Sequence, residues 1–62
     1  MSALYKMPTL ERAAYVAEIL RGIRIDAWEE WRTGQPYLVV ASDQRGIDAA
    51  VQRLEPRAQR NR

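Results

Sequence analysis

The chain of 62 residues has room for one domain, and a domain of this size buries only about 60% of the surface that its unfolded chain exposes. Cysteine and histidine are absent, which excludes disulfides, thiolate metal sites and an ordinary zinc site. The formal net charge is only +2. We therefore expect stability to come from packing or from association with a protein partner or a second copy, with no metal and no cofactor.

The first residues lack the apolar core of a signal peptide, and no segment approaches the length of a transmembrane span. The longest apolar run is only Tyr37 to Ala41. Together with the absence of cysteine, this favours a cytoplasmic protein that does not enter a membrane.

The first predicted elements are a strand over residues 3–7 and a helix from Leu10 to Arg21. Pro8 ends the strand because proline cannot donate to a strand ladder. Thr9 is a suitable N-cap, and Gly22 is expected to end the helix in a left-handed C-cap. Four apolar residues recur at helical spacing and predict the buried face: Ala13, Val16, Ala17 and Leu20.

A β-hairpin is predicted next. Apolar and polar residues alternate from Ile23 to Trp31, which is typical of a half-buried strand with Ile23, Ile25 and Ala27 inward. The turn is expected over residues 33–36. The partner strand, residues 37–41, is apolar on both faces and is therefore expected inside the sheet.

A second helix is expected after Ser42 and Asp43, which would cap it. Its apolar stripe consists of Ile47, Ala50, Val51 and Leu54, and Pro56 ends it. Residues 56–62 have no apolar partner for packing and are expected to form a basic, disordered tail after a single domain of residues 1–55.

The predicted order is β-α-β-β-α, an α+β fold with two helices on one face of a small three-stranded antiparallel sheet. This is a truncated ferredoxin-like arrangement without its last strand. The strand order stays open: the first strand lies either parallel to the third across a β-α-β crossover or at an edge.

Trp28 is the most informative single residue. Alternation places it with Arg24, Asp26 and Glu30, on the face away from the helices, where tryptophan is typical of a binding hot spot. The alternative is a β-bulge that turns Trp28 into the core and leaves Trp31 outside. We expect a partner-binding surface of Trp28, Trp31 and Tyr37 with Arg24 and Glu30 at its rim.

The residue types of the chain give little support for a catalytic site. Glu29 and Glu30 are neighbours in a strand, so their carboxylates diverge and cannot act as an acid/base pair. No histidine is present to activate a serine or threonine, and the three glycines are isolated. We expect that the protein is not an enzyme.

The last ten residues suggest a second kind of partner. They hold one acidic residue against four arginines, namely Arg53, Arg57, Arg60 and Arg62. Arginines bind phosphates and sheet aromatics stack on bases, so a nucleic-acid-binding accessory protein is an alternative. Acidic residues around the tryptophans make it the weaker one.

Three segments together resemble a known family: Leu4 to Lys6, Glu11 to Arg21, and Gly22 to Ala27. The family is the bacterial signal-transducing protein family, short domains compared by fold with nitrogen-regulatory PII proteins. Residues 37–43 and 47–54 occupy its last strand and helix. The chain departs from the pattern in its shorter hairpin loop and in Arg24, where a small residue or proline is common.

The resemblance implies a fold and carries no catalytic residue onto this chain. The expected function is a small regulatory or protein-interaction module. A phage-type inhibitor of a host protein complex and, by fold analogy, a small-molecule sensor are alternatives.

Overall fold

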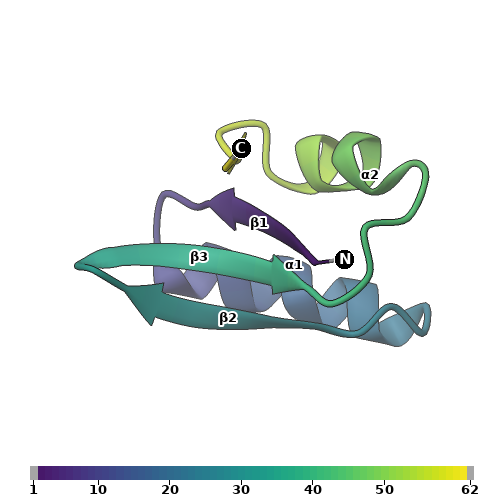
Figure 1. The fold of residues 1–62 in the computed structure, drawn as a ribbon, viewed down its shortest axis with the longest axis horizontal. Helices are drawn as coiled ribbons and strands as arrows, with labels where there is room; N and C mark the ends of the chain where they lie inside the picture. Colours follow the sequence, from purple (N-terminus) through teal and green to yellow (C-terminus); the bar gives the residue numbers. More distant parts are fainter. Residues whose placement is uncertain (1, 62) are drawn as a thin grey trace.

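A computed structural model describes residues 2–61 of the chain. The six elements are β1 (Ala3–Lys6), α1 (Leu10–Gly22), β2 (Ala27–Arg32), β3 (Gln35–Val40), α2 (Ile47–Leu54) and β4 (Gln59–Arg60). The strands form one antiparallel sheet in the order β2-β3-β1-β4, and the fold is α+β (Figure 1).

The central place of β3 confirms the prediction made from its two apolar faces. The predicted count of three strands is wrong, and so is a first strand parallel to the third. In the structure β1 pairs antiparallel with β3 and lies between β3 and β4. Because β1 and β2 both run antiparallel to β3, they run parallel to each other, and β3 lies between them.

The start of α1 follows the prediction. Thr9 is the N-cap, and its hydroxyl accepts a hydrogen bond from the backbone N–H of Arg12 at 3.0 Å. The four residues of the predicted apolar face are the buried residues of the helix.

The end of α1 differs from the prediction, because Gly22 is still helical and does not have a positive φ. The chain turns two residues later, where Arg24 has φ 66°. The backbone N–H groups of Ile25 and Arg24 donate to the carbonyls of Leu20 and Arg21, both at 3.0 Å. These two bonds define a Schellman motif with Arg24 in the position that glycine usually takes. The predicted start of the second strand at Ile23 is therefore wrong, and β2 begins at Ala27.

The hairpin between β2 and β3 is tighter than predicted. Arg32 pairs with Gln35, so the loop consists of Thr33 and Gly34 alone, with φ 49° and 71°. Positive φ at both loop positions is the geometry of a type I′ turn, whose twist matches that of the strands. Pro36, expected in the turn, lies within β3 opposite Trp31.

The start of α2 also differs from the prediction. Gly46, with φ 88°, is the N-cap and makes no side-chain cap bond. Ser42 and Asp43 do not cap the helix because they lie before its N-cap, and the carboxylate of Asp43 binds the guanidinium of Arg60 instead. Only a residue that tolerates the left-handed region fits at position 46 without strain.

The segment after Pro56 is ordered, in contrast to the expected tail. Gln59 and Arg60 pair with β1, and the N–H of Asn61 donates to the carbonyl of Leu4 at 2.8 Å. Ala58 is buried and belongs to the core. The boundary expected at residue 55 is therefore not the end of the packed structure, which reaches residue 61.

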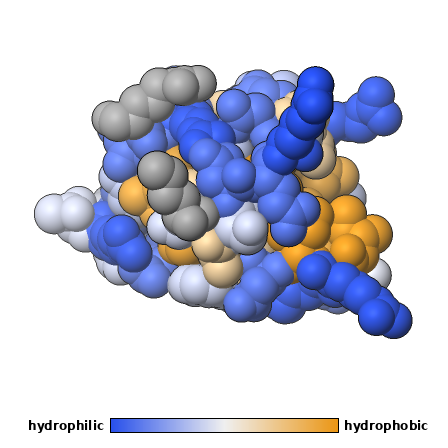
Figure 2. Space-filling view, turned by 45° about the vertical axis from the view of Figure 1, so that its right-hand side comes forward, coloured by the Kyte–Doolittle hydropathy of each residue, from blue (hydrophilic) through white to orange (hydrophobic). Residues whose placement is uncertain are grey.

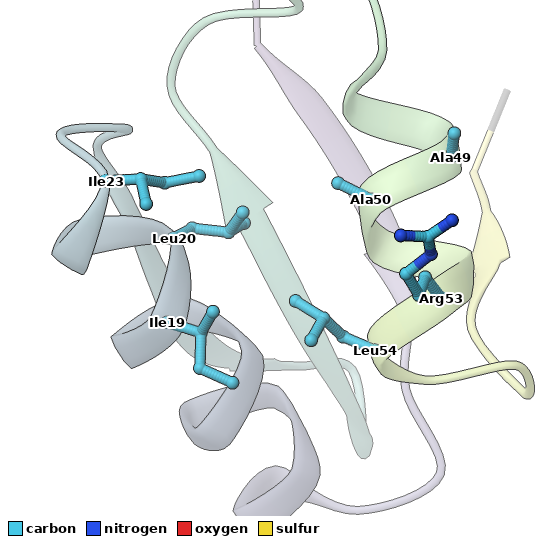
Figure 3. Close-up of a pocket in the computed structure, with 7 residues that line it drawn as sticks. All are labelled: Ile19, Leu20, Ile23, Ala49, Ala50, Arg53 and Leu54. Carbon is cyan, nitrogen blue, oxygen red and sulfur yellow. The ribbon is translucent and has the colours of Figure 1, made fainter.

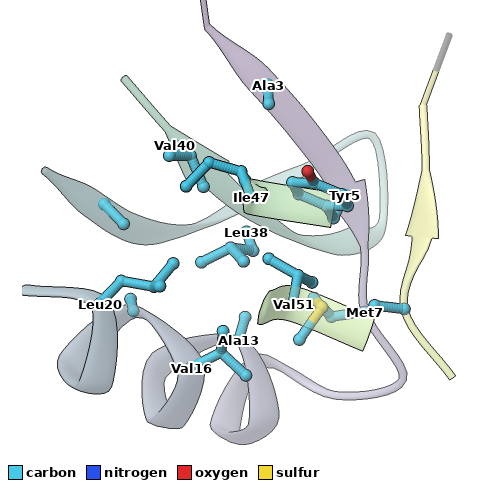
Figure 4. Close-up of a cluster of buried hydrophobic side chains, with 13 residues drawn as sticks. Ala3, Tyr5, Met7, Ala13, Val16, Leu20, Leu38, Val40, Ile47 and Val51 are labelled. Atoms are coloured by element: carbon cyan, nitrogen blue, oxygen red, sulfur yellow. The ribbon is translucent and has the colours of Figure 1, made fainter. Parts of the chain in front are cut away.

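One apolar core holds the layers together. Both helices bury their apolar faces against the same face of the sheet (Figure 4). The sheet contributes Ala3, Tyr5, Ala27, Leu38 and Val40 to this core, and Met7 joins it directly after β1. No helix among the described residues is long and apolar enough to cross a membrane.

Candidate functional site

The face of the sheet that neither helix covers is the first candidate site, and we call it the open sheet face. Its central row runs across three strands, because Val39 pairs with Trp28 on one side and with Leu4 on the other. Residues directly opposite in antiparallel strands point to the same face. Trp28 follows Ala27, a core residue, and therefore points away from the helices.

Val39 demonstrates that this row is packed. It is only 4% exposed, yet it is not a member of the core cluster beneath the helices. Its burial therefore comes from neighbours on the open sheet face. Trp28 covers it on one side and is itself still 38% exposed. The row is a small second apolar cluster with one large aromatic ring at the surface.

A polar row lies next to it. Tyr37 pairs with Glu30 on one side and with Lys6 on the other. Glu30 accepts a hydrogen bond from Arg32 and another from the indole N–H of Trp28 at 3.2 Å. The Arg32 contact, followed by the Trp28 contact, holds the pKa of the Glu30 carboxyl below its ordinary value. The indole ring is thereby oriented by a charged neighbour on the same face.

The structure brings together only part of the predicted surface. Trp28, Tyr37 and Glu30 share the open sheet face. The continuous register from Ala27 to Arg32 contains no bulge, so Trp31 points to the opposite face, where it is 59% exposed. Arg24 lies in the Schellman turn before β2. The two tryptophans are therefore separate features.

The carboxylates of Glu29 and Glu30 diverge, as predicted. Glu29 pairs with Leu38, a core-facing residue, whereas Glu30 pairs with Tyr37 on the open sheet face. Among the described residues, no three acidic side chains cluster in a way that would hold a metal ion.

The four arginines of the C-terminal segment do not form one basic surface. Arg57 binds the carboxylate of Glu55 at 2.9 Å. Arg60 binds Asp43 at 2.5 Å and Asp48 at 2.7 Å. Arg53 lies on α2, and Arg62 lies outside the described residues. Two of the charges are thus already neutralised within the fold.

Around Arg60 lies a polar cluster that the sequence did not indicate. The hydroxyl of Tyr5 donates to Asp48 at 2.5 Å, and the guanidinium of Arg60 lies over the Tyr5 ring, 5.6 Å from its centroid. Burial, followed by the Asp48 contact, raises the pKa of Tyr5 above its ordinary value. The cluster joins β1, β4 and the start of α2 and has a structural role.

Two further residues of the open sheet face were also not predicted from the sequence. Leu4 and Lys6 belong to it because their neighbour Tyr5 faces the core. Alternation in the first strand would have predicted this once one inward residue was known.

Comparison of the chain with protein-family models, with curated protein sequences and with solved structures finds no match.

Proposed function

We propose that this chain is a small protein-interaction module that binds a protein partner, or a second copy of itself, through the open sheet face. One observation carries the proposal: Trp28 is exposed on a helix-free face, directly beside the packed apolar row of Val39 and Leu4. A tryptophan at the surface of a well-packed patch is typical of a binding hot spot.

The surroundings of Trp28 indicate the chemistry of the partner surface. The charges of Glu30 and Arg32 neutralise each other in a salt bridge. Lys6, on the same face, has no ion-pair partner among residues 2–61. An apolar centre with a polar rim is the usual anatomy of an interface. A complementary partner presents an apolar patch with a carboxylate placed to meet Lys6.

We also propose that the fold is ferredoxin-like. The element order β-α-β-β-α-β and the strand order β2-β3-β1-β4 support a ferredoxin-like arrangement. A regulatory role of the kind found in the bacterial signal-transducing protein family is compatible with it. Function on this fold still depends on the surface residues and not on the arrangement itself.

Nucleic-acid binding through the C-terminal arginines is less well supported. Release of counterions from phosphates needs cationic side chains that are free to contact them. Arg57 and Arg60 instead hold Glu55, Asp43 and Asp48.

The two tryptophans provide a matched test, because they lie on the same strand and point to opposite faces. Trp28→Ala is expected to weaken association by about 2 kcal/mol, or roughly 30-fold, as is usual for a hot-spot tryptophan. Trp31→Ala is expected to leave it within about twofold. Self-association is measured by sedimentation equilibrium, and partner binding by quantitative capture from a native lysate with each variant as bait.

Circular dichroism checks that both variants keep their helix content. Association that survives Trp28→Ala, or that is lost only with Trp31→Ala, would contradict the proposal. Unfolding of the Trp28→Ala protein would assign the ring a structural role, and Lys6→Glu then tests the same face without removing the ring.

A further inference from the structure

A groove of about 420 Å³ separates the two helices on the side of the molecule opposite the open sheet face (Figure 3). Its walls come from the C-terminal half of α1 and from α2. Side chains of both helices project into the space between them, as Figure 3 shows for Leu20, Ile23, Ala50 and Leu54. The lining is aliphatic except for one residue and contains Ile19, Leu20, Ile23, Ala50, Arg53 and Leu54.

A small residue on α2 leaves this groove open. Ala50 lies on the side of α2 that faces α1, where a longer side chain would close the space between the helices. Ile23, at the end of α1, is 63% exposed although it is large and apolar. Hydrophobic side chains also reach the surface as a patch bordered by hydrophilic ones in Figure 2. The groove has the volume of a small-molecule site.

Among the residues that the structure describes, Arg53 is the only charged one in the lining. Within residues 2–61 it has no ion-pair or hydrogen-bond partner for its side chain, in contrast to Arg12, Arg57 and Arg60. An unpaired guanidinium beside an aliphatic surface complements an anionic group on a ligand whose remainder is apolar.

The groove is poorly suited to an extended peptide. Its walls are helices, whose backbone groups are bonded within the helix, and the carbonyl of Leu54 at the end of α2 accepts from Arg12 at 3.1 Å. A peptide backbone would lie against aliphatic side chains without hydrogen-bond partners, which is costly. A simple aliphatic chain has no such groups to satisfy.

We propose that the groove between α1 and α2 binds a medium-chain fatty carboxylate, with the aliphatic chain between the helices and the carboxylate paired with Arg53. This site is independent of the open sheet face. Loss of partner binding on Trp28→Ala and loss of fatty-acid binding in the groove are therefore separate results.

Sodium octanoate, kept below its micelle concentration, is the probe. In a methyl NMR titration of the full chain, octanoate is expected to shift the methyl signals of Leu20 and Leu54 saturably, whereas octylammonium of equal length binds at least fivefold more weakly. Ala50→Leu, which fills the groove, is expected to weaken octanoate binding at least tenfold. Arg53→Gln is expected to remove the preference for octanoate over octylammonium.

The matched control is Arg45→Gln, which removes an equal charge outside the groove and is expected to leave octanoate binding unchanged. Thermal unfolding establishes that each variant is folded; if Ala50→Leu does not fold, Arg53→Gln decides. Equal binding of the two probes, unsaturable shifts, or unchanged binding by Ala50→Leu would overturn the proposal. So would a dimer that Ala50→Leu dissociates, because a second copy would then fill the groove.

Discussion

At the level of single residues, Glu55 is the charged side chain that the fold buries most deeply among residues 2–61, with 2% of it exposed. Its carboxylate accepts from Arg12 of α1 at 2.8 Å and from Arg57 at 2.9 Å. The Arg57 contact, followed by that of Arg12, lowers the pKa of Glu55 from 4.5 to about 2. The group therefore joins the first helix to the segment that follows the second.

This lowered pKa predicts a loss of stability in acid. The unfolded chain binds a proton at Glu55 near pH 4.5, whereas the folded chain does so only near pH 2. The contribution of Glu55 is therefore complete above pH 4.5 and is lost as the pH falls towards 2. Urea unfolding at pH 5.5 and pH 2.5, followed by circular dichroism, measures it. Glu55→Gln is expected to be less stable at pH 5.5 and to show a smaller difference between the two pH values.

Glu18→Gln is the control, because Glu18 is exposed on α1 and has no ion-pair partner in the described part of the chain. Asp43 also has a lowered pKa, from its contact with Arg60, and contributes to the acid sensitivity of every variant. An acid sensitivity that is the same in Glu55→Gln and in the unmodified protein would refute the role of Glu55.

At the level of elements, the end of α1 contains a backbone position that this sequence fills unfavourably. Arg24 has φ 66°, which costs an L-residue with a Cβ about 1–2 kcal/mol relative to its usual region. The Schellman bonds to Leu20 and Arg21 hold it there. A hydrophobic contact between the flanking residues, Ile25 and Leu20, is a usual companion of this motif.

Arg24→Gly is therefore expected to stabilise the protein. Glycine adopts this φ without strain, and part of the gain is offset by its greater freedom in the unfolded chain. We expect a net gain of about 0.5–1 kcal/mol in the free energy of unfolding, measured by urea denaturation. Arg21→Gly, in the helix itself, is the opposite control and is expected to destabilise. A destabilised Arg24→Gly protein would show that this turn is not left-handed in solution.

At the level of the whole molecule, the C-terminal segment closes the fold. β4 covers the edge of β1, and Ala58 belongs to the core. Arg60 of β4 forms salt bridges with Asp43 and Asp48. The free energy of unfolding of a domain is only about 0.05–0.15 kcal/mol per residue, so the total for 62 residues is small. The loss of one such closing segment is a large fraction of that total.

Truncation after Pro56 is accordingly expected to lower the free energy of unfolding by about 1–3 kcal/mol, as measured by urea denaturation. The shortened chain is also expected to aggregate more readily, because the edge of β1 becomes available for pairing. Asn61→Ala keeps the backbone bond to Leu4 and serves as the mild control. A truncated chain with unchanged stability would contradict a closing role for this segment.

Sequence patterns predicted most of the elements and half of the candidate surface. Helical spacing identified the buried face of α1, and the two apolar faces of the partner strand placed β3 inside the sheet. Strand alternation separated Glu29 from Glu30 and placed Trp28 on the helix-free face. Each of these depends only on the local period of a helix or strand, which neighbouring residues determine.

Features outside this local period decided the rest. Gly22 marked the end of α1 too early, because the turn that follows is set by the bonds of Arg24 to Arg21 and of Ile25 to Leu20, which place the left-handed residue at Arg24. Other features depend on contacts between residues far apart in the chain. The basic segment looked disordered because its partners, Asp43, Asp48 and the edge of β1, lie far away in the chain. The groove between the helices exists only where Ala50 and Leu20 face each other across a gap. Local periodicity carries no information on such pairs, and only the tertiary structure brings them together.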